Sequence, residues 1–153
     1  MTKDRVEVIA KQRYQKDISP WLSPEILCEN PWIQLHNEII KFYQFYGPCE
    51  SEDRIRKDFY FRVRDQIKKV WPYAKIKIFG STASRLYLPQ SDLDVVVFLP
   101  KSKVDDLKLV KTLQNKLSKL AWTRSCESIG AKVPIVKLED TVSGLFMDIS
   151  FNK

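Results

Sequence analysis

The sequence is poor in the residues that form structural zinc sites or disulfide frameworks. It has one histidine, His36, and three widely spaced cysteines at positions 28, 49 and 126, with no C-x-x-C pair. An odd number of isolated cysteines argues against both kinds of site. We therefore expect reduced, buried thiols in an intracellular protein, and we place His36 outside any catalytic centre.

Long apolar segments are also missing. No run of 18 apolar residues occurs, and the first residues, MTKDR, do not begin an apolar signal segment. These absences predict a protein with no membrane partner, located in the cytosol or nucleus. Nearly half of the 153 residues are apolar and 12% are aromatic. This length and composition are typical of one soluble folded domain with a substantial core.

The charged residues are unbalanced toward the basic side. There are 26 Lys and Arg against 19 Asp and Glu, a formal net charge of +7. Such a surface suits a polyanion such as RNA, DNA or a nucleotide, although an ordinary solvated surface explains it equally well. The lysines at 68–69, 101–103 and 116–119 carry the same two interpretations: an RNA-facing surface or a solvated one.

Three helices are expected from the apolar spacing. Residues 1–29 are mixed and basic and are interpreted as a partly ordered arm, followed by one domain over residues 30–153. Helices are predicted to follow Asn30 and Ser51 and to span residues 104–122. Their core-facing residues are predicted to be Trp32, Leu35, Ile39, Phe42 and Tyr46, then Ile55, Phe59, Val63, Ile67 and Val70, then Val104, Leu107, Val110, Leu113, Leu117 and Leu120.

Strands are expected where the apolar period changes to two. Four segments fit this pattern, at 75–79, 93–99, 133–138 and 145–151. Helices, two strands, a helix and then two or three strands predict an α/β (α+β) fold with a mixed β-sheet of about five strands and flanking helices.

An acidic pair opens the valine-rich strand. Asp92 and Asp94 stand two residues apart, so both side chains leave one face of the strand, while Leu93, Val95 and Val97 face the core. Asp148 interrupts the last apolar strand, and an isolated charge there is costly unless it is paired or binds a cation. If the two strands are neighbours, three carboxylates converge. Hard oxygen ligands of this kind suit Mg²⁺ or Mn²⁺, held as two ions.

A glycine and a serine follow the first predicted strand. Gly80 and Ser81 lie at its end, ten residues or so before Asp92. Glycine lets a phosphate approach the backbone closely, and the Ser81 hydroxyl with the following N–H groups can bind phosphate oxygens. A short helix near residues 82–85 would add a favourable field, with Arg85 as a nearby cation. Each element alone has a structural explanation, but the combined order is far more specific.

This combination resembles a known family. Phe79-Gly80-Ser81, Asp92-Leu93-Asp94 and Asp148 are similar to the signature of the DNA polymerase β-type nucleotidyltransferases, and in particular to the Trf-type poly(A) RNA polymerases, also called the DNA polymerase sigma group. The resemblance covers about residues 19–153 and is carried by residues 19–21, 35–39, 78–81, 86–94, 133–138 and 142–151.

The resemblance implies a chemistry for each of these residues. Asp92 and Asp94 would hold both metal ions, Asp148 would hold the catalytic ion and help to deprotonate a 3′-hydroxyl, and Gly80 with Ser81 would bind the triphosphate. The reaction would be metal-dependent addition of NMP, most simply AMP from ATP, to an RNA 3′ end with release of pyrophosphate. A zinc-knuckle RNA-binding protein and a helicase would be partners in nuclear RNA surveillance, with the cytoplasm as the alternative location.

The chain departs from the family in one respect. It stops at Lys153, just after the third carboxylate. The family's central helical domain, which supplies base stacking and nucleotide selection, would follow. We therefore expect a catalytic-domain fragment, a truncated product or a divergent paralogue, weakly active or inactive by itself. An inactive or regulatory fragment that binds RNA or a partner is the alternative, and a small-molecule nucleotidyltransferase of the same fold is a third.

Overall fold

The computed structural model describes residues 21, 26, 30–100 and 104–152. Two compact units divide the chain, Met1–Gly47 and Pro48–Lys153. Most of the arm predicted over residues 1–29 lies outside the described residues, as does Cys28. None of the described helices has both the length and the apolar character needed to cross a membrane.

The first unit contains helix α2 (Pro31–Tyr46). The Asn30 side chain accepts a hydrogen bond from the Trp32 N–H, which caps the helix as expected. The Trp21 ring packs on its last turns, with centroids 5.0 Å from Phe42 and 5.3 Å from Tyr46. The predicted core face is wrong over the first turns, because Trp32, Leu35 and Ile39 are exposed. Among the described residues of this unit, the packing is concentrated at the C-terminal end of the helix.

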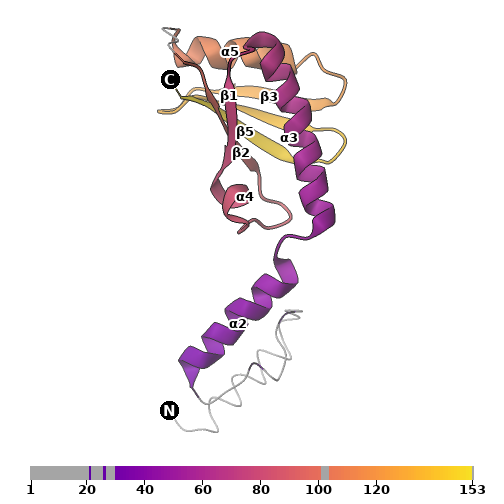
Figure 1. The fold of residues 1–153 in the computed structure, drawn as a ribbon, viewed down its shortest axis with the longest axis vertical. Coiled ribbons are helices and arrows are strands. Elements are labelled where there is room, and N and C mark those ends of the chain that lie inside the picture. The colour runs from indigo at the N-terminus through magenta and orange to yellow at the C-terminus, as the bar shows by residue number, and fades with distance from the viewer. Residues whose placement is uncertain (1–20, 22–25, 27–29, 101–103, 153) are drawn as a thin grey trace. The chain divides into compact units, whose positions relative to one another are not determined.

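The second unit is built on a mixed five-stranded sheet, which confirms the predicted fold class (Figure 1). Its strands lie in the order β1-β2-β5-β4-β3, where β2 and β5 are parallel and all other neighbours are antiparallel. The bounds are β1 (Lys75–Phe79), β2 (Leu93–Phe98), β3 (Thr123–Ile129), β4 (Ile135–Asp140) and β5 (Phe146–Asn152). The sequence does not locate β3, because this edge strand is mostly polar and only partly buried.

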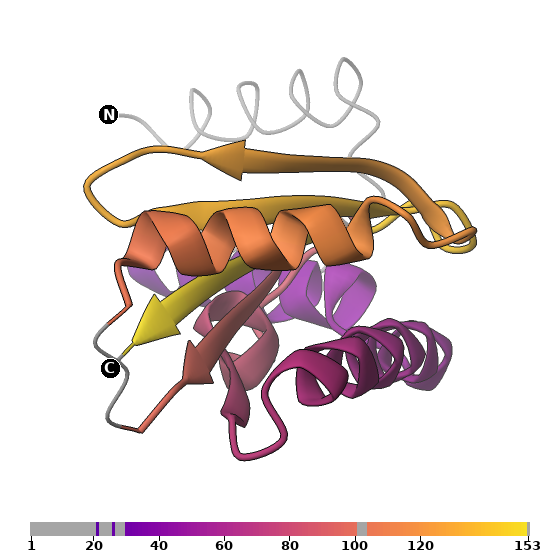
Figure 2. The same ribbon diagram turned by 90° about the horizontal axis from the view of Figure 1, so that it is seen from above.

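Helices α3 (Glu50–Val70) and α5 (Asp106–Leu117) complete the core with one face of the sheet. Figure 2 shows α5 lying against the sheet, and it packs on β3, β4 and β5. The inward residues of the strands alternate as predicted, and Leu93, Val95 and Val97 are fully buried. Their neighbours in sequence therefore point to the opposite face of the sheet.

Two helical predictions need correction. The last helix begins at Asp106 and ends at Leu117, so it is shorter than residues 104–122, and Val104 and Leu107 are exposed. In α3, Ile55 is exposed while its neighbour Arg56 is buried. The apolar spacing selects Ile55, but at that turn the helix faces a loop whose carbonyl oxygens take the Arg56 guanidinium instead.

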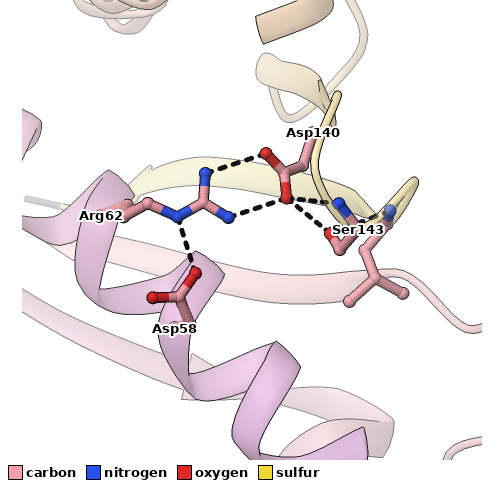
Figure 3. Close-up of polar contacts among 5 residues, drawn as sticks. Asp58, Arg62, Asp140 and Ser143 are labelled. Carbon is pink, nitrogen blue, oxygen red and sulfur yellow. Dashed lines mark hydrogen bonds and ion pairs between the residues drawn. The ribbon is translucent and has the colours of Figure 1, made fainter. Parts of the chain in front are cut away.

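One ion pair fastens α3 to the turn between β4 and β5 (Figure 3). Arg62 donates to both oxygens of the fully buried Asp140 at 2.9 and 2.8 Å, and Ser143 donates to Asp140 from its amide and its hydroxyl. Burial by itself raises the pKa of Asp140, but the Arg62 and Ser143 hydrogen bonds outweigh it and hold the pKa at about 2. This turn leads directly into β5, the strand that carries Asp148.

The cysteines match their prediction only in part. Cys49 and Cys126 are free thiols, as expected. Cys126 is half-buried, whereas Cys49 is exposed at the start of α3, where its sulfur lies 3.0 Å from the Ser51 hydroxyl. The exposed position follows from its place as the residue preceding the helix.

Candidate active site

The strand register brings two of the predicted aspartates together. Asp94 on β2 is the direct partner of Asp148 on the adjacent parallel strand β5. Asp148 is in turn opposite Lys137 on β4, and Asp94 is opposite Phe79 at the end of β1. Paired residues of neighbouring strands point to the same face. A row of charged side chains therefore crosses the middle of the sheet, on the face opposite the core.

The third aspartate, Asp92, comes just before β2, and the loop ahead of it is held by a buried arginine. The Arg56 side chain donates three hydrogen bonds, of 2.8 to 3.1 Å, to the backbone carbonyls of Ser91, Leu88 and Pro89. Its guanidinium also lies 4.1 Å from the centroid of the Tyr87 ring. These contacts fix the backbone from which Asp92 projects.

A second α3 residue holds the other end of the same loop. Asp53 accepts a hydrogen bond of 2.6 Å from the Tyr87 hydroxyl and one of 2.8 Å from Arg85. The two donors lower the pKa of Asp53, with Tyr87 contributing most. Arg85, whose direction the sequence leaves open, therefore points toward α3.

Gly80 is required by the position of Asp94. The glycine begins helix α4 (Gly80–Ser84), with φ of +65°, where other residues are strained. A Cβ atom at this position would overlap the Asp94 carboxylate. The helix starts two residues earlier than expected from sequence, so Gly80 and Ser81 form its first turn beside Asp94.

The carboxylates on this face destabilise one another's charged forms. Burial raises the pKa of Asp94, and the charge of Asp92 raises it further. Burial also raises the pKa of Asp148, where Asp92 and Asp94 act in the same direction and Lys137 opposes them. A cation bound among the three would relieve this repulsion.

Lys137 already supplies one positive charge at this place. Its Nζ lies 3.0 Å from Asp92 Oδ2 and 3.8 Å from Asp148 Oδ1. The hydrogen bond with Asp92 raises the pKa of Lys137, while burial acts in the opposite direction. From its sequence pattern, Lys137 is expected only to lie in a strand. Its place directly opposite Asp148 depends on the β4–β5 register, which no sequence pattern fixed.

The donor set fits a hard divalent cation, although the ligands are not gathered into a finished cluster. The described residues contain no group of three or more His, Cys, Asp or Glu side chains already placed around one point. However, Asp148 Oδ1 is buried without a hydrogen-bond partner among the described residues. Carboxylate oxygens are the ligands that Mg²⁺ and Mn²⁺ prefer, so these residues fit such an ion.

Sequence comparisons place this unit among polymerases. Residues 35–153 match the family described as the central palm domain of mitochondrial-like poly(A) RNA polymerase. Poly(A) RNA polymerase protein 1 of Eremothecium gossypii is 32% identical over 140 residues, which cover 82% of this chain and 22% of that protein. The inactive non-canonical poly(A) RNA polymerase protein Trf4-2 of Drosophila melanogaster is also 32% identical over 140 residues, covering 87% of this chain and 33% of that protein.

Solved structures of polymerases share the fold. The polymerase core of TRAMP, an RNA surveillance complex, has a TM-score of 0.68 and 29% identity, over 82% of this chain and 43% of that one. The Cid1 poly(U) polymerase bound to Mg 3′-dATP has a TM-score of 0.64 and 25% identity, over 74% and 35%.

This chain matches only part of the length of these relatives. The chain spans about a fifth to a third of the E. gossypii and D. melanogaster relatives. The match nevertheless covers most of this chain, including the whole sheet and both aspartate-bearing strands. The chain therefore belongs to the poly(A) RNA polymerase family, within its palm domain.

Proposed function

We propose that this chain is the catalytic portion of a nucleotidyltransferase that adds AMP from ATP to RNA 3′ ends, with Asp92, Asp94 and Asp148 as its catalytic and metal-binding residues. The observation that carries the proposal is the Asp94–Asp148 pairing across parallel strands, with Asp92 on the adjoining loop. Three carboxylates that repel one another on the face opposite the core are unfavourable without a cation, and they suit a divalent ion.

Each residue of the site has its own role in this reaction. Asp92 and Asp94 would hold both metal ions, and Asp148 would hold the catalytic ion and help to deprotonate the RNA 3′-hydroxyl. Bound Mg²⁺ or Mn²⁺ supplies the charge that favours an ionised hydroxyl and neutralises the departing pyrophosphate. Gly80 and Ser81, beside Asp94, bind the triphosphate through backbone N–H groups and the serine hydroxyl.

The relatives give support to a substrate and to a biological role. Poly(A) polymerase names among the curated relatives favour ATP, and the Cid1 complex with Mg 3′-dATP favours a magnesium-bound nucleotide. Similarity to the polymerase core of TRAMP, an RNA surveillance complex, supports a role in RNA surveillance. From the family resemblance alone, a nuclear location is proposed, with a zinc-knuckle RNA-binding protein and a helicase as partners. The cytoplasm remains the alternative location.

The test is direct transfer of AMP. A labelled RNA oligonucleotide is incubated with ATP, Mg²⁺ or Mn²⁺ and a high concentration of the chain, over hours. We expect slow extension that is absent without metal and absent in the Asp92→Ala/Asp94→Ala double variant. Extension that is equal in the wild-type chain and the double variant would contradict the proposal.

A second candidate is a binding fragment that keeps the fold but not turnover. The inactive D. melanogaster relative and the net charge of +7 favour it. It predicts RNA binding that is unchanged by Asp92→Ala and weakens steeply as salt rises. Metal-dependent extension by the chain would exclude this candidate.

A further inference from the structure

The carboxylate face contains its own cation, and that cation contacts two of the proposed metal ligands at once. Lys137 Nζ is within hydrogen-bonding distance of Asp92 Oδ2, at 3.0 Å, and 3.8 Å from Asp148 Oδ1. Asp148 Oδ1 is buried and has no hydrogen-bond partner among the described residues. The same two carboxylates would hold a divalent ion at the proposed site.

The position of Lys137 is built into the sheet. The residue is directly opposite Asp148 in the β4–β5 pairing, and its neighbours Val136 and Leu138 are fully buried. The alternation of the strand therefore directs Lys137 to the carboxylate face. The Phe146 ring lies beside the ammonium, with its centroid 5.3 Å from Nζ. The side chains of Lys137, Asp92 and Asp148 are only 38, 34 and 26% exposed, so water screens these charges less than at an open surface.

We infer that Lys137 is a resident counter-ion that competes with divalent metal for Asp92 and Asp148. The inference rests on the proposed metal site and concerns how that site is loaded. While Lys137 contacts the carboxylates, it compensates their repulsion and keeps Asp92 directed toward Asp148. A divalent ion replaces that compensation with two charges, so the ammonium must move away because like charges repel. The long, flexible lysine side chain permits this movement without any change in the sheet.

Removing the ammonium should therefore tighten metal binding. Lys137→Met keeps an unbranched side chain only one heavy atom shorter and removes its charge. By isothermal titration with Mn²⁺ alone, we expect this variant of the full chain to bind at least about tenfold more tightly than wild type. Lys137→Arg keeps the charge and is expected to stay within about threefold of wild type.

A matched control separates this effect from the loss of net charge. Lys75 is exposed on β1, opposite Phe98, so it lies on the same face but away from the aspartates. Lys75→Met changes the net charge equally and should leave Mn²⁺ affinity within about twofold of wild type. If Lys75→Met and Lys137→Met increase the Mn²⁺ affinity equally, Lys137 does not compete locally with the metal and the inference is overturned.

The outcomes distinguish this inference from the proposed function. If wild type binds Mn²⁺ and a folded Lys137→Met variant binds it equally or more weakly, the inference fails and the metal site stands. If neither chain binds Mn²⁺, both fail. Should Lys137→Met not fold, lysine ammonium NMR on the wild-type chain decides: addition of Mg²⁺ must shift the Lys137 signal more than that of Lys75, and an unmoved Lys137 signal overturns the inference.

Discussion

At the scale of single residues, Gly80 shows how closely the proposed site constrains the chain. Its positive φ makes any side chain costly, and a Cβ there would also displace the Asp94 carboxylate. Gly144 offers a natural comparison because its φ of +72° is similar and a Cβ there would meet nothing within 4 Å. The two glycines therefore share the backbone strain but differ in their contact with the site.

This pair gives the first prediction. Gly80→Ala and Gly144→Ala should each lower the free energy of unfolding by roughly 1–2 kcal/mol, from the left-handed backbone alone. Only Gly80→Ala should also weaken Mn²⁺ binding, by about tenfold or more, because its Cβ moves the Asp94 carboxylate. Urea unfolding and Mn²⁺ titration measure the two effects. Equal metal affinity in both variants would show that Gly80 does not position the carboxylate.

The sequence correctly predicts which face a side chain occupies where that depends on a single strand. The alternation around Leu93 correctly places Asp94 opposite the buried face, because a strand has a period of two whatever its neighbours are. It fails for Lys137, whose importance comes from the strand beside it. The register of β4 against β5 is a tertiary property, and Lys137 within an apolar strand is indistinguishable in sequence from a solvated lysine.

At the scale of elements, helix α3 fastens both ends of the site. Arg56 holds the loop before Asp92, and Arg62 holds the turn before β5. Helical periodicity predicts apolar residues on such a face, so it selects Ile55 and misses Arg56. Only the loop packed against that turn of the helix explains why a guanidinium is buried there.

The loop contact leads to a prediction. Arg56→Met should lower the free energy of unfolding by about 2–4 kcal/mol, because three backbone carbonyls lose a charged donor. Arg54→Met is the control on the same helix, since Arg54 pairs with Glu50 and both side chains are at least 80% exposed. Its melting temperature should hardly change. Similar losses in the two variants would contradict the role given to Arg56.

The Arg62–Asp140 pair predicts a dependence on pH. The pKa of Asp140 is about 2, below the value of about 3.9 in an unfolded chain. Because the pKa of Asp140 is lower in the folded chain, its ionised carboxylate stabilises the fold at pH values above the pKa of the unfolded chain. This stabilisation is lost as pH falls from about 4 to about 2. Asp140→Asn should therefore lower the free energy of unfolding by roughly 2–3 kcal/mol at pH 7. In this variant the free energy of unfolding should also decrease less between about pH 4 and about pH 2 than in wild type.

Asp58 supplies the control for that experiment. It also pairs with Arg62, at 2.8 Å, but its side chain is 64% exposed. Asp58→Asn should leave the free energy of unfolding nearly unchanged at pH 7, and stability should still be lost at acid pH as in wild type. If Asp140→Asn loses as much stability at acid pH as wild type does, other carboxylates determine that loss.

At the scale of the whole molecule, the order of elements was predictable and their packing was not. Two strands, a helix and further strands correctly indicate a mixed sheet, yet the polar edge strand β3 and the end of α5 escape sequence periodicity. The first unit shows the same limit, because the apolar spacing of α2 is helical over residues that the structure leaves exposed. The spacing of apolar residues indicates the local backbone geometry, whereas the burial of their side chains depends on which other element packs against them.

The proposed function of the whole molecule depends on one property, a divalent-metal site made by Asp92, Asp94 and Asp148. Mn²⁺ titration of the wild-type chain and of the three single Asp→Ala variants tests it most directly. We predict saturable binding of up to about two ions by wild type and at least about tenfold weaker binding by each folded variant. Absence of binding by the wild-type chain, or an affinity that all three substitutions leave unchanged, would contradict it.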